Sequence, residues 1–490
     1  MGDNLLVIDE GTTSTRSMLF AHDGRCLGIS QEALTQSFPQ PGWVEQDAEE
    51  IWLLSLGCAQ AMVVKGGGAG RIAAIGITNQ RETIVFWSRR SGRALAPAIV
   101  WQDRRTGEMC ANLRAEGHEP ALQAKTGLLL DPYFSATKIA WALAHWPQLR
   151  EAGDDLCIGT VESWLVFRLT GGLHISDATN ASRTALMDIG GGRWDDGLID
   201  LFGVPRAALP EIVDCAGRFG TSLPEHFGEP LLICGLAGDQ QSAAIGQACF
   251  APGDTKATYG TGAFVLSHAG VAQPVSTQRL LTTIAWQIGG ERRFALEGSL
   301  FVAGSAFQWL RDALGFFVAT AECEALARSV PDCGGVQFVP AFTGLGAPHW
   351  RSDARGAILG LTLGSTRAHI ARAALEAVAN QTEELRRAFA ADGVDWSHLR
   401  IDGAMAGNAF LAQDLADLLD MDVERPANVE TTALGAAMLA GLGCGMFGSL
   451  EETAVARGEL TRFSPTMTND VRAERIARWD RATRAVLTVD

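Results

Sequence analysis

Residues 5–20, "LLVIDEGTTSTRSMLF", place a polar turn between two apolar runs. The alternation predicts two β-strands joined at a tight turn. An Asn-Gly pair would turn the chain more easily, so the Thr-Thr-Ser-Thr-Arg run needs another reason. Backbone N–H groups, hydroxyls, a guanidinium and a carboxylate at one strand end are the groups that hold a phosphate and its magnesium ion. A Thr-rich surface hairpin is the alternative interpretation.

The composition is that of a globular protein with a sizeable core. The chain has 490 residues, 47% of them apolar and 20% charged, which allows about three ordinary domains or two large ones. Ten cysteines without a Cys-x-x-Cys pair favour a reduced, cytoplasmic compartment. The N-terminus lacks a basic and apolar leader, and no apolar run reaches about 18 residues. A net charge of −16 without a basic block argues against nucleic acid or anionic membranes as partners.

The second half of the chain repeats the plan of the first. Residues 255–270, "TKATYGTGAFVLSHAG", again give strand, Thr-Gly turn and strand. We therefore predict a duplicated α/β fold with two domains, residues 1–248 and 249–490. No Pro/Ser-rich linker separates them, so we expect a broad shared interface.

Other segments alternate strand and helix patterns, as α/β folds do. Residues 71–87 predict strand, turn and strand, and residues 229–248 predict a strand followed by a helix. Residues 299–315 and 367–393 have helical spacing of apolar residues and end at glycine. A Gly-x-Gly-x-x-Gly at Gly443, Gly445 and Gly448 follows a helical pattern, so we interpret it as a helix-ending loop. A Walker A loop and a His-Arg-Asp kinase signature are absent.

Two acidic residues follow apolar runs that predict buried strands. Asp9 follows "LLVI" and Asp239 follows "LLICGLAG". Both are expected at the carboxyl edge of a sheet, where open α/β folds place their sites. The alternatives are turn formation with Gly11 for Asp9 and a helix N-cap for Asp239.

Three further stretches carry groups suited to a polyol. "NQRE" (79–82), "VWQDRR" (100–105) and "DPYF" (131–134) contain Arg81, Glu82, Trp101 and Tyr133. An Arg-Glu pair after a buried strand offers a donor and an acceptor to neighbouring hydroxyls, and an aromatic ring offers a wall for carbon atoms. A structural salt bridge and ordinary core packing are the alternatives.

Nine stretches together resemble one family. They are "DEGTTSTR", "GITNQRET", "VWQDRRT", "TGLLLDPYFSATK", "TNASRT", "AGDQQSA", "TYGTGAF", "EGSLFVAGSAFQWLRD" and "FVPAFTGLGAPHW". In this order and spacing they are similar to the glycerol kinases of the FGGY carbohydrate kinase family, from about residue 5 to beyond 460. The resemblance implies two ribonuclease-H-like domains of the actin/hexokinase type with a catalytic cleft between them. It also implies ATP-dependent phosphorylation of glycerol to sn-glycerol 3-phosphate with Mg²⁺, a step of glycerol catabolism.

The resemblance assigns residues to the two substrates and the metal. Glycerol would be held by Arg81, Glu82, Trp101, Tyr133, Asp239, Gln240 and Phe264, with Asp239 as general base. The nucleotide would contact Thr12, Thr13, Ser14, Arg16, Thr261, Gly304, Gln308, Ala404 and Asn408. Asp9 and Asp239 would lie at the magnesium ion, Asp9 through water. A homo-oligomer, dimer or tetramer, is also expected.

The sequence departs from the family pattern at four places. Glu10 replaces a usual Gln, and we expect it to add negative charge beside the phosphates. Ala404 replaces a glycine, and its methyl group is expected to crowd or shift the nucleotide. His349 replaces a usual Tyr. The loop at 221–232 lacks the stretch that binds fructose 1,6-bisphosphate in some relatives, which argues against feedback control by that sugar. His226 resembles a histidine that is phosphorylated in other relatives, but the match around it is short.

Two other functions are compatible with these motifs. A kinase of another polyol or sugar, such as erythritol or a pentulose, is one, although "NQRE" with Trp101 and Tyr133 favours glycerol. A non-catalytic sugar- or nucleotide-binding regulator is the other. Such proteins commonly lose the base and add a DNA-binding segment, whereas Asp239 is present here and the first strand begins at residue 5.

Overall fold

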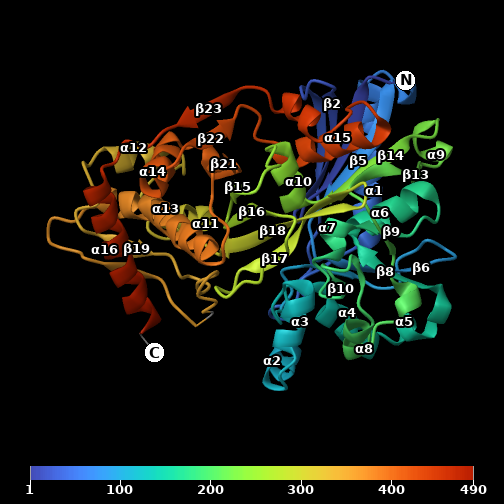
Figure 1. The fold of residues 1–490 in the computed structure, drawn as a ribbon, viewed down its shortest axis with the longest axis horizontal. Coiled ribbons are helices and arrows are strands. Elements are labelled where there is room, and N and C mark those ends of the chain that lie inside the picture. Colours follow the sequence, from blue (N-terminus) through green and yellow to red (C-terminus); the bar gives the residue numbers. More distant parts are fainter. Residues whose placement is uncertain (1, 352, 489–490) are drawn as a thin grey trace.

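The computed structural model describes residues 2–351 and 353–488, and two large mixed sheets dominate it (Figure 1). The first sheet has the strand order β13–β14–β5–β1–β2–β3. Its strands are β1 (Asn4–Glu10), β2 (Ser14–Ala21), β3 (Cys26–Ala33), β5 (Ile72–Asn79), β13 (Ala216–Thr221) and β14 (Leu232–Gly238). β1 is antiparallel to β2 and parallel to β5, which is in turn parallel to β14.

The second sheet has the order β17–β18–β16–β15–β21–β22–β23. Its strands are β15 (Asp254–Tyr259), β16 (Ala263–Gly270), β17 (Leu281–Ile288), β18 (Glu291–Leu300), β21 (His398–Asp402), β22 (Val423–Pro426) and β23 (Leu460–Phe463). β15 is antiparallel to β16 and parallel to β21, which is parallel to β22.

The two sheets share one topology. In each sheet, three neighbouring strands are each antiparallel to the next, β3–β2–β1 and β18–β16–β15. Two further strands follow that are parallel to β1 or β15, namely β5–β14 and β21–β22. This repeat is the ribonuclease-H-like arrangement, and the predicted duplicated α/β fold is confirmed.

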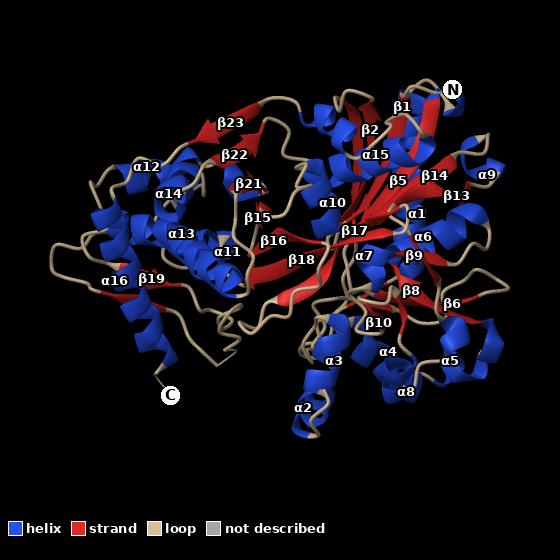
Figure 2. Ribbon diagram, in the orientation of Figure 1, coloured by secondary structure: helices blue, strands red, loops and turns tan. Residues whose placement is uncertain are grey.

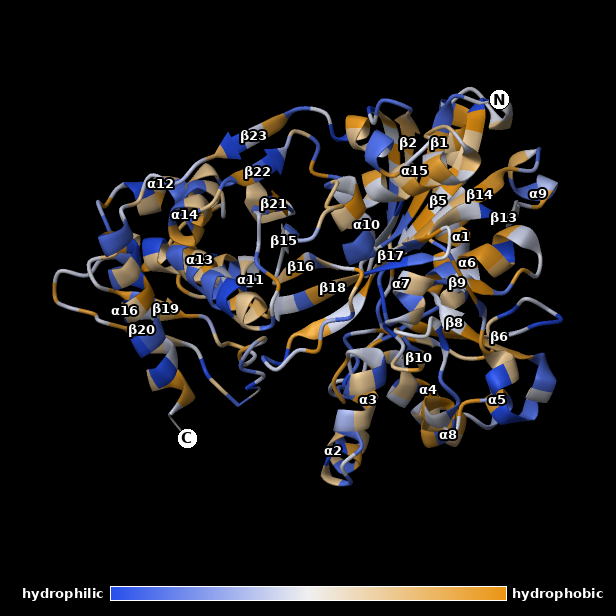
Figure 3. Ribbon diagram, viewed as in Figure 1, coloured by the Kyte–Doolittle hydropathy of each residue, from blue (hydrophilic) through white to orange (hydrophobic). Residues whose placement is uncertain are grey.

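Helices cover both faces of the first sheet because its central strand is apolar on both sides. Leu6 and Ile8 of β1 pack in one cluster with α1 (Ala48–Lys65) and α6 (Val161–Thr170). Leu5 and Val7 point the other way, into a cluster with α10 (Asp239–Gly246) and α15 (Thr431–Cys444). In Figure 3 much of the ribbon around β1, β2 and β5 has the hydrophobic colour.

Helix α15 belongs to the last part of the chain but lies on the first sheet. In Figure 1 it sits beside the strands of the N-terminal half, far in sequence from them. Its residues Ala436 and Ala440 stand against Gly76 of β5, and Ala440 also against Gly235 of β14. The chain therefore returns to the first sheet after completing most of the second.

The second sheet is covered by its own set of helices, shown with the strands in Figure 2. They are α11 (Gly304–Asp312), α12 (Glu322–Arg328), α13 (Arg367–Ala391), α14 (Ala409–Leu419) and α16 (Asn469–Leu487). One apolar cluster joins residues of the sheet, α13, α14 and α16. The helix predicted within 299–315 starts later than its pattern indicated, because Ser299 and Leu300 complete β18 and only Gly304 begins α11.

The rest of the N-terminal half forms smaller elements beside the first sheet. The strands β4 (Glu45–Gln46), β7 (Ala98–Ile99), β6 (Ile84–Ser88) and β8 (Leu156–Thr160) make a four-stranded sheet. The helices there are α2 (Gly107–Ala115), α3 (Glu119–Thr126), α4 (Ser135–His145), α5 (Pro147–Glu151), α7 (Ala178–Ala181), α8 (Asp196–Phe202) and α9 (Pro224–Phe227).

Short strand pairs complete the fold: β9 (Ile175–Asp177) with β12 (Glu211–Val213), β10 (Met187–Asp188) with β11 (Arg193–Trp194), and β19 (Gln337–Val339) with β20 (Ala357–Leu359). Among the helices of residues 2–351 and 353–488, none has the length and apolar character needed to cross a lipid bilayer.

Candidate active site between the two halves

The polar turn at 11–13 joins β1 to β2, as the opening stretch predicts. Asp9 is buried on β1, and Arg16 on β2 donates to its carboxylate. The same guanidinium donates to Glu430, just before α15, at 2.6 Å. Burial raises the pKa of Asp9, although the charge of Arg16 opposes that rise. Beside this turn, at the carboxyl end of β1, the Arg16 guanidinium of β2 is therefore fixed between two carboxylates.

Glu10 does not add charge to this turn, and that expectation is wrong. Successive residues of a strand point to opposite faces, so Glu10 faces away from Asp9, toward α1. There Ser55 Oγ donates to Glu10 Oε2 at 2.6 Å, and the carboxyl is fully buried. Burial raises the pKa of Glu10 to about 8, which favours the neutral acid at this position.

Three aromatic rings from three separate parts of the sequence meet in one place. The Trp101 ring lies 5.6 Å from that of Tyr133 and 6.3 Å from that of Phe264, both edge-on. Phe264 belongs to β16 of the second sheet, so the wall has contributions from both halves. The Trp101 indole N–H also donates to Thr12 Oγ1 at 2.8 Å. The predicted polyol wall and the predicted phosphate turn are thus in direct contact.

Asp239 lies beside this wall at the start of α10. The helix is capped by Gly238, and no side chain caps it, so the N-cap alternative for Asp239 is wrong. Its carboxylate lies 3.2 Å from Arg81 Nε and is about one-third exposed, at 34%. Arg81 Nη2 in turn donates to the Tyr133 hydroxyl at 3.3 Å. A solvent-reachable carboxylate therefore stands next to a buried arginine and the aromatic rings.

Gln240 follows Asp239 and is held by a lysine that the motifs did not single out. Lys256 of β15 is fully buried, and its ammonium donates to Gln240 Oε1 and, at 2.9 Å, to Thr258 Oγ1. Burial lowers the pKa of Lys256, while Asp402 and Asp239 oppose that shift. A cation buried on this strand therefore orients the amide beside the candidate base.

Two more residues of the site escaped the sequence analysis, although both lie in quoted motifs. Glu297 of β18 and Arg183, which follows α7, make buried ion pairs with Arg81 and Glu82. The available signal was a single charged residue inside an apolar stretch, "FALEGSL" for Glu297. Such a residue needs a buried partner, but the sequence does not say which one.

The residues predicted to contact the nucleotide from the C-terminal half form a second group. Ala303 and Ser305 donate backbone N–H groups to the Thr261 carbonyl, at 2.9 and 3.1 Å. The turn at 260–262, α11 and the segment around Ala404 lie close together. A Cβ added to Gly304 would be 2.5 Å from the Gly260 carbonyl oxygen and 3.4 Å from Met405 Sδ. Gln308 lies exposed one turn along α11, and Ala404 is exposed. Asn408 caps α14 by accepting from Leu411 N–H at 3.0 Å.

The carboxylates present fit a magnesium ion that is held mainly by substrate. Within the described ranges, 2–351 and 353–488, no group of three or more His, Cys, Asp or Glu residues is placed to bind a metal. The charge of Asp239 is near enough to contribute to the raised pKa of Asp9. Magnesium in kinases is commonly bound by one or two carboxylates together with substrate phosphates, and this pair can supply them.

The remaining family departures lie outside this group of residues. His349 Nε2 is 3.3 Å from Glu384 Oε1 on α13. His226 on α9 places Nε2 3.2 Å from the Arg168 carbonyl oxygen, and its ring packs edge-on against Trp52. The loop at 221–232 contains α9 and the start of β14.

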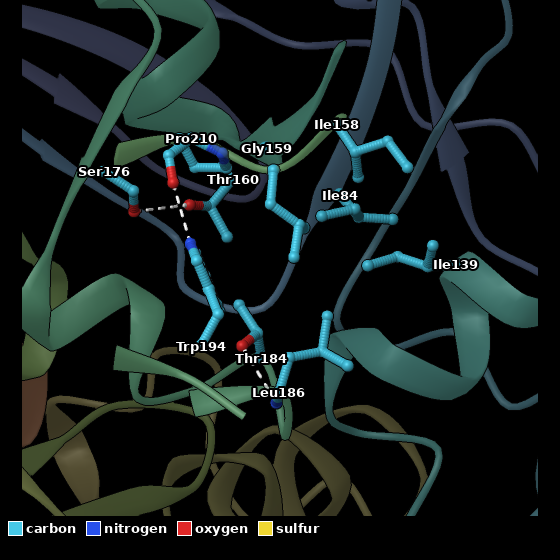
Figure 4. A pocket seen from close by; sticks show the side chains of 11 residues that line it. Ile84, Ile139, Ile158, Gly159, Thr160, Ser176, Thr184, Leu186, Trp194 and Pro210 are labelled. Carbon is cyan, nitrogen blue, oxygen red and sulfur yellow. Dashed lines mark hydrogen bonds between the residues drawn. The ribbon is translucent and has the colours of Figure 1, made fainter. Parts of the chain in front are cut away.

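Two hollows elsewhere are unsuited to the predicted substrates. The cavity in Figure 4 has a volume of about 10 Å³ and lies in the core of the N-terminal half, between Ile84, Ile139 and Trp194. It has room for about one water molecule. A groove of about 730 Å³ is lined by Glu45, Asp47, Glu49 and Glu50 among others, and four carboxylates there would repel a nucleotide.

The duplicated fold and the residues between its halves define a two-domain carbohydrate kinase. Residues 4–246 match the N-terminal domain, and residues 255–444 the C-terminal domain, of the FGGY family of carbohydrate kinases. The chain belongs to this family.

Several relatives cover the full length. A glycerol kinase of Methylobacterium nodulans is 52% identical over 491 residues, with 99% of this chain and 98% of the relative aligned. A glycerol kinase of Gluconobacter oxydans is 53% identical, with 99% and 96% aligned. Among solved structures, a Plasmodium falciparum glycerol kinase with ADP superposes with a TM-score of 0.94 at 36% identity and full coverage of both chains.

Proposed function

We propose that this protein transfers the terminal phosphoryl group of ATP to glycerol, giving sn-glycerol 3-phosphate and ADP. The observation that carries the proposal is the meeting of Trp101, Tyr133 and Phe264 with Arg81 and Asp239. Full-length relatives named glycerol kinase, at 52–53% identity, support the choice of glycerol within the carbohydrate kinases.

The polyol is held by contacts of two kinds. Arg81 and Tyr133 can donate hydrogen bonds to its hydroxyl groups, and Glu82 can accept them. Trp101 and Phe264 offer ring faces and edges to the carbon chain. A three-carbon polyol presents both a hydroxyl pattern and a small apolar surface, and this combination of side chains matches both.

Asp239 then acts on the reacting hydroxyl. As the hydroxyl oxygen forms its bond to the terminal phosphorus, its proton passes to the Asp239 carboxylate, and the bond from phosphorus to the ADP oxygen breaks in line with the new one. Gln240, fixed by Lys256, stands beside the base and holds the same end of the substrate. The protein's main contribution is alignment of the two reactants.

The phosphates are received by the turn at 11–13 and its neighbours. Thr12, Thr13 and Ser14 offer hydroxyl and backbone donors, and Arg16 offers a guanidinium already positioned by Asp9 and Glu430. Thr261, Gly304, Gln308, Ala404 and Asn408 contact the nucleotide from the other half. Asp9 and Asp239 would hold magnesium, which neutralises charge on the phosphate oxygens when bound.

The test is an ADP-release assay with ATP and Mg²⁺ on glycerol, erythritol and xylulose, for the wild-type protein and Asp239→Asn. We expect turnover of glycerol above the other two. We expect the variant to lose about 10²–10⁴-fold in kcat, since it cannot take the proton.

The matched control is Asp195→Asn, because Asp195 also lies at a helix start, where it caps α8 through Leu198 N–H at 2.9 Å. It should keep wild-type turnover. Preferred turnover of another polyol would refute glycerol as the substrate. A fully active Asp239→Asn would refute the general base.

The domain boundary near residue 248, a cytoplasmic location and a homo-oligomeric state remain predictions. The crowding of the nucleotide by Ala404 also remains one.

A further inference from the structure

The side chains of Arg81 and Glu82 belong to a closed ring of charges. Arg81 Nη1 donates to Glu297 Oε2 at 2.5 Å, and Arg183 Nη2 donates to Glu297 Oε1 at 2.8 Å. Arg183 Nε donates to Glu82 Oε1 at 2.6 Å. Since Arg81 and Glu82 are consecutive, the backbone closes the ring. Within the ring, Glu297 and Arg183 each have two oppositely charged partners. Arg81 and Glu82 each have one, and the backbone joins them to each other.

The ring is buried. The exposed fractions are 2% for Arg81, 1% for Glu82, 0% for Arg183 and 1% for Glu297. Removing one member of a buried ion pair leaves its partner charged and unsolvated. The positions of Arg81 and Glu82 are therefore dictated by Arg183 and Glu297 rather than by solvent.

The backbone under the ring is also constrained. Glu82 has φ +62°, a left-handed conformation that is uncommon for a residue other than glycine. Ser135 Oγ anchors this residue by donating to the Glu82 carbonyl at 2.9 Å. A conformation of this kind persists where the surroundings fix it, and the ion pair with Arg183 fixes the side chain of Glu82.

Glu297 is the member that comes from the other half of the chain. It lies on β18 of the second sheet, whereas Arg81, Glu82 and Arg183 follow elements of the N-terminal half. Burial would raise the pKa of Glu297, but Arg183 and Arg81 outweigh it and lower the pKa to about 2. The carboxylate is therefore ionised at neutral pH and is shared by two guanidinium groups.

This sharing bears on Asp239. Arg81 Nε lies 3.2 Å from the Asp239 carboxylate, and an arginine with no other partner would bind that carboxylate more tightly. With Glu297 on its Nη1, Arg81 is already balanced and held from the far side. The Asp239 carboxylate, which is 34% exposed, then remains available to a hydroxyl group.

We propose that Glu297 is a positioning residue of the polyol site, which holds Arg81 and Arg183 from the second sheet and shares the charge of Arg81 with Asp239. This inference rests on the proposed function. It predicts that loss of Glu297 weakens glycerol binding. Nucleotide binding, which involves α11 and the segments around Thr261 and Ala404, should be unaffected.

The experiment measures kcat and both KM values for Glu297→Gln, which keeps the shape and removes the charge. We expect KM for glycerol to rise by about tenfold or more and kcat to fall, with KM for ATP within about twofold of wild type. The matched control is Glu383→Gln: Glu383 is 2% exposed and pairs with Arg386 at 2.6 Å on α13. It should leave both KM values unchanged.

A second pair of variants keeps the test decisive if Glu297→Gln does not fold. Arg183→Lys retains the charge but cannot donate to Glu82 and Glu297 at once as the guanidinium does. It should also raise KM for glycerol selectively. Glu297→Asp should recover part of the glycerol affinity by restoring the carboxylate.

The outcomes separate the two proposals. A wild-type protein that does not phosphorylate glycerol refutes the proposed function, and this inference with it. An active wild type whose Glu297→Gln and Arg183→Lys variants change only the thermal midpoint, or change KM for ATP equally, refutes the positioning role alone.

Discussion

At the scale of single residues, one step along a strand separates two acids into different roles. Asp9 faces Arg16 and the site, whereas Glu10 lies under α1 against Ser55. Both carboxyls are buried, but Asp9 pairs with the Arg16 guanidinium, whereas the partner of Glu10 is the neutral Ser55 hydroxyl. Burial without such a partner favours the neutral acid, and it raises the pKa of Glu10 to about 8.

The buried Glu10 predicts a pH-dependent stability. Its pKa is raised by burial from an ordinary 4.5 to about 8. Below about pH 4.5 both folded and unfolded chains hold the proton, so the neutral carboxyl contributes fully. Between about 4.5 and 8 only the folded chain holds it, and stability falls by about 1.4 kcal/mol per pH unit. Above about 8 the loss is complete.

The variant Glu10→Gln has no proton to lose at this position. Its free energy of unfolding, relative to wild type, should therefore rise steadily from pH 5 to pH 8 and level off above. Denaturant unfolding of both proteins at several pH values measures this difference. A difference that is constant over the range would mean that Glu10 is ionised in the folded protein.

At the scale of secondary-structure elements, two glycines set how closely α10 and α15 approach. A Cβ on Gly435 would lie 1.8 Å from the Ser242 carbonyl oxygen, and one on Gly246 would lie 2.0 Å from that of Thr431. Such close helix packing excludes even a methyl group. Because Asp239 begins α10 and Glu430 directly precedes α15, the spacing of these helices also bears on the site.

We therefore expect Gly435→Ala to destabilise the protein by about 1–3 kcal/mol or more and to lower kcat, because α10 must shift with Asp239. Thermal unfolding and the ADP-release assay measure the two effects. The control is Gly57→Ala in the middle of α1, where a Cβ meets nothing within 4 Å; it should stabilise by about 0.5–1 kcal/mol. A Gly435→Ala protein as stable as the control would contradict the close packing.

At the scale of the whole molecule, α15 ties the two halves together. The face of the first sheet that carries Leu5, Val7 and Met18 is covered by α10 and α15. The first 248 residues include α10 but lack α15, so they cannot bury this face alone. The two halves are repeats in topology, but they are not independent in packing.

A fragment of residues 1–248 is accordingly expected to be poorly soluble or to expose apolar surface that binds a hydrophobic dye. Joining residues 428–450 to it through a flexible linker should restore folding, since that segment contains α15. Circular dichroism, dye binding and size-exclusion chromatography measure the effect. A 1–248 fragment that is monomeric and unfolds cooperatively would show that α15 is dispensable for the first sheet.

The sequence determined the features that depend on local pattern. Alternation and turn chemistry indicated the strand–turn–strand units at 5–20 and 255–270, and the repeat of that unit indicated the duplicated fold. Trp101, Tyr133 and Phe264 could be proposed as one group because each lies in a recognisable motif, and the structure does bring them together.

Only the tertiary structure decided which charges meet inside the protein. Glu297 and Arg81 are separated by 216 residues, and nothing local to either one selects the other. The burial of Glu10 against Ser55 and the return of α15 to the first sheet were likewise decided by the tertiary structure. Local sequence sets backbone preference and polarity, whereas burial and pairing of charges depend on what the rest of the chain places around them.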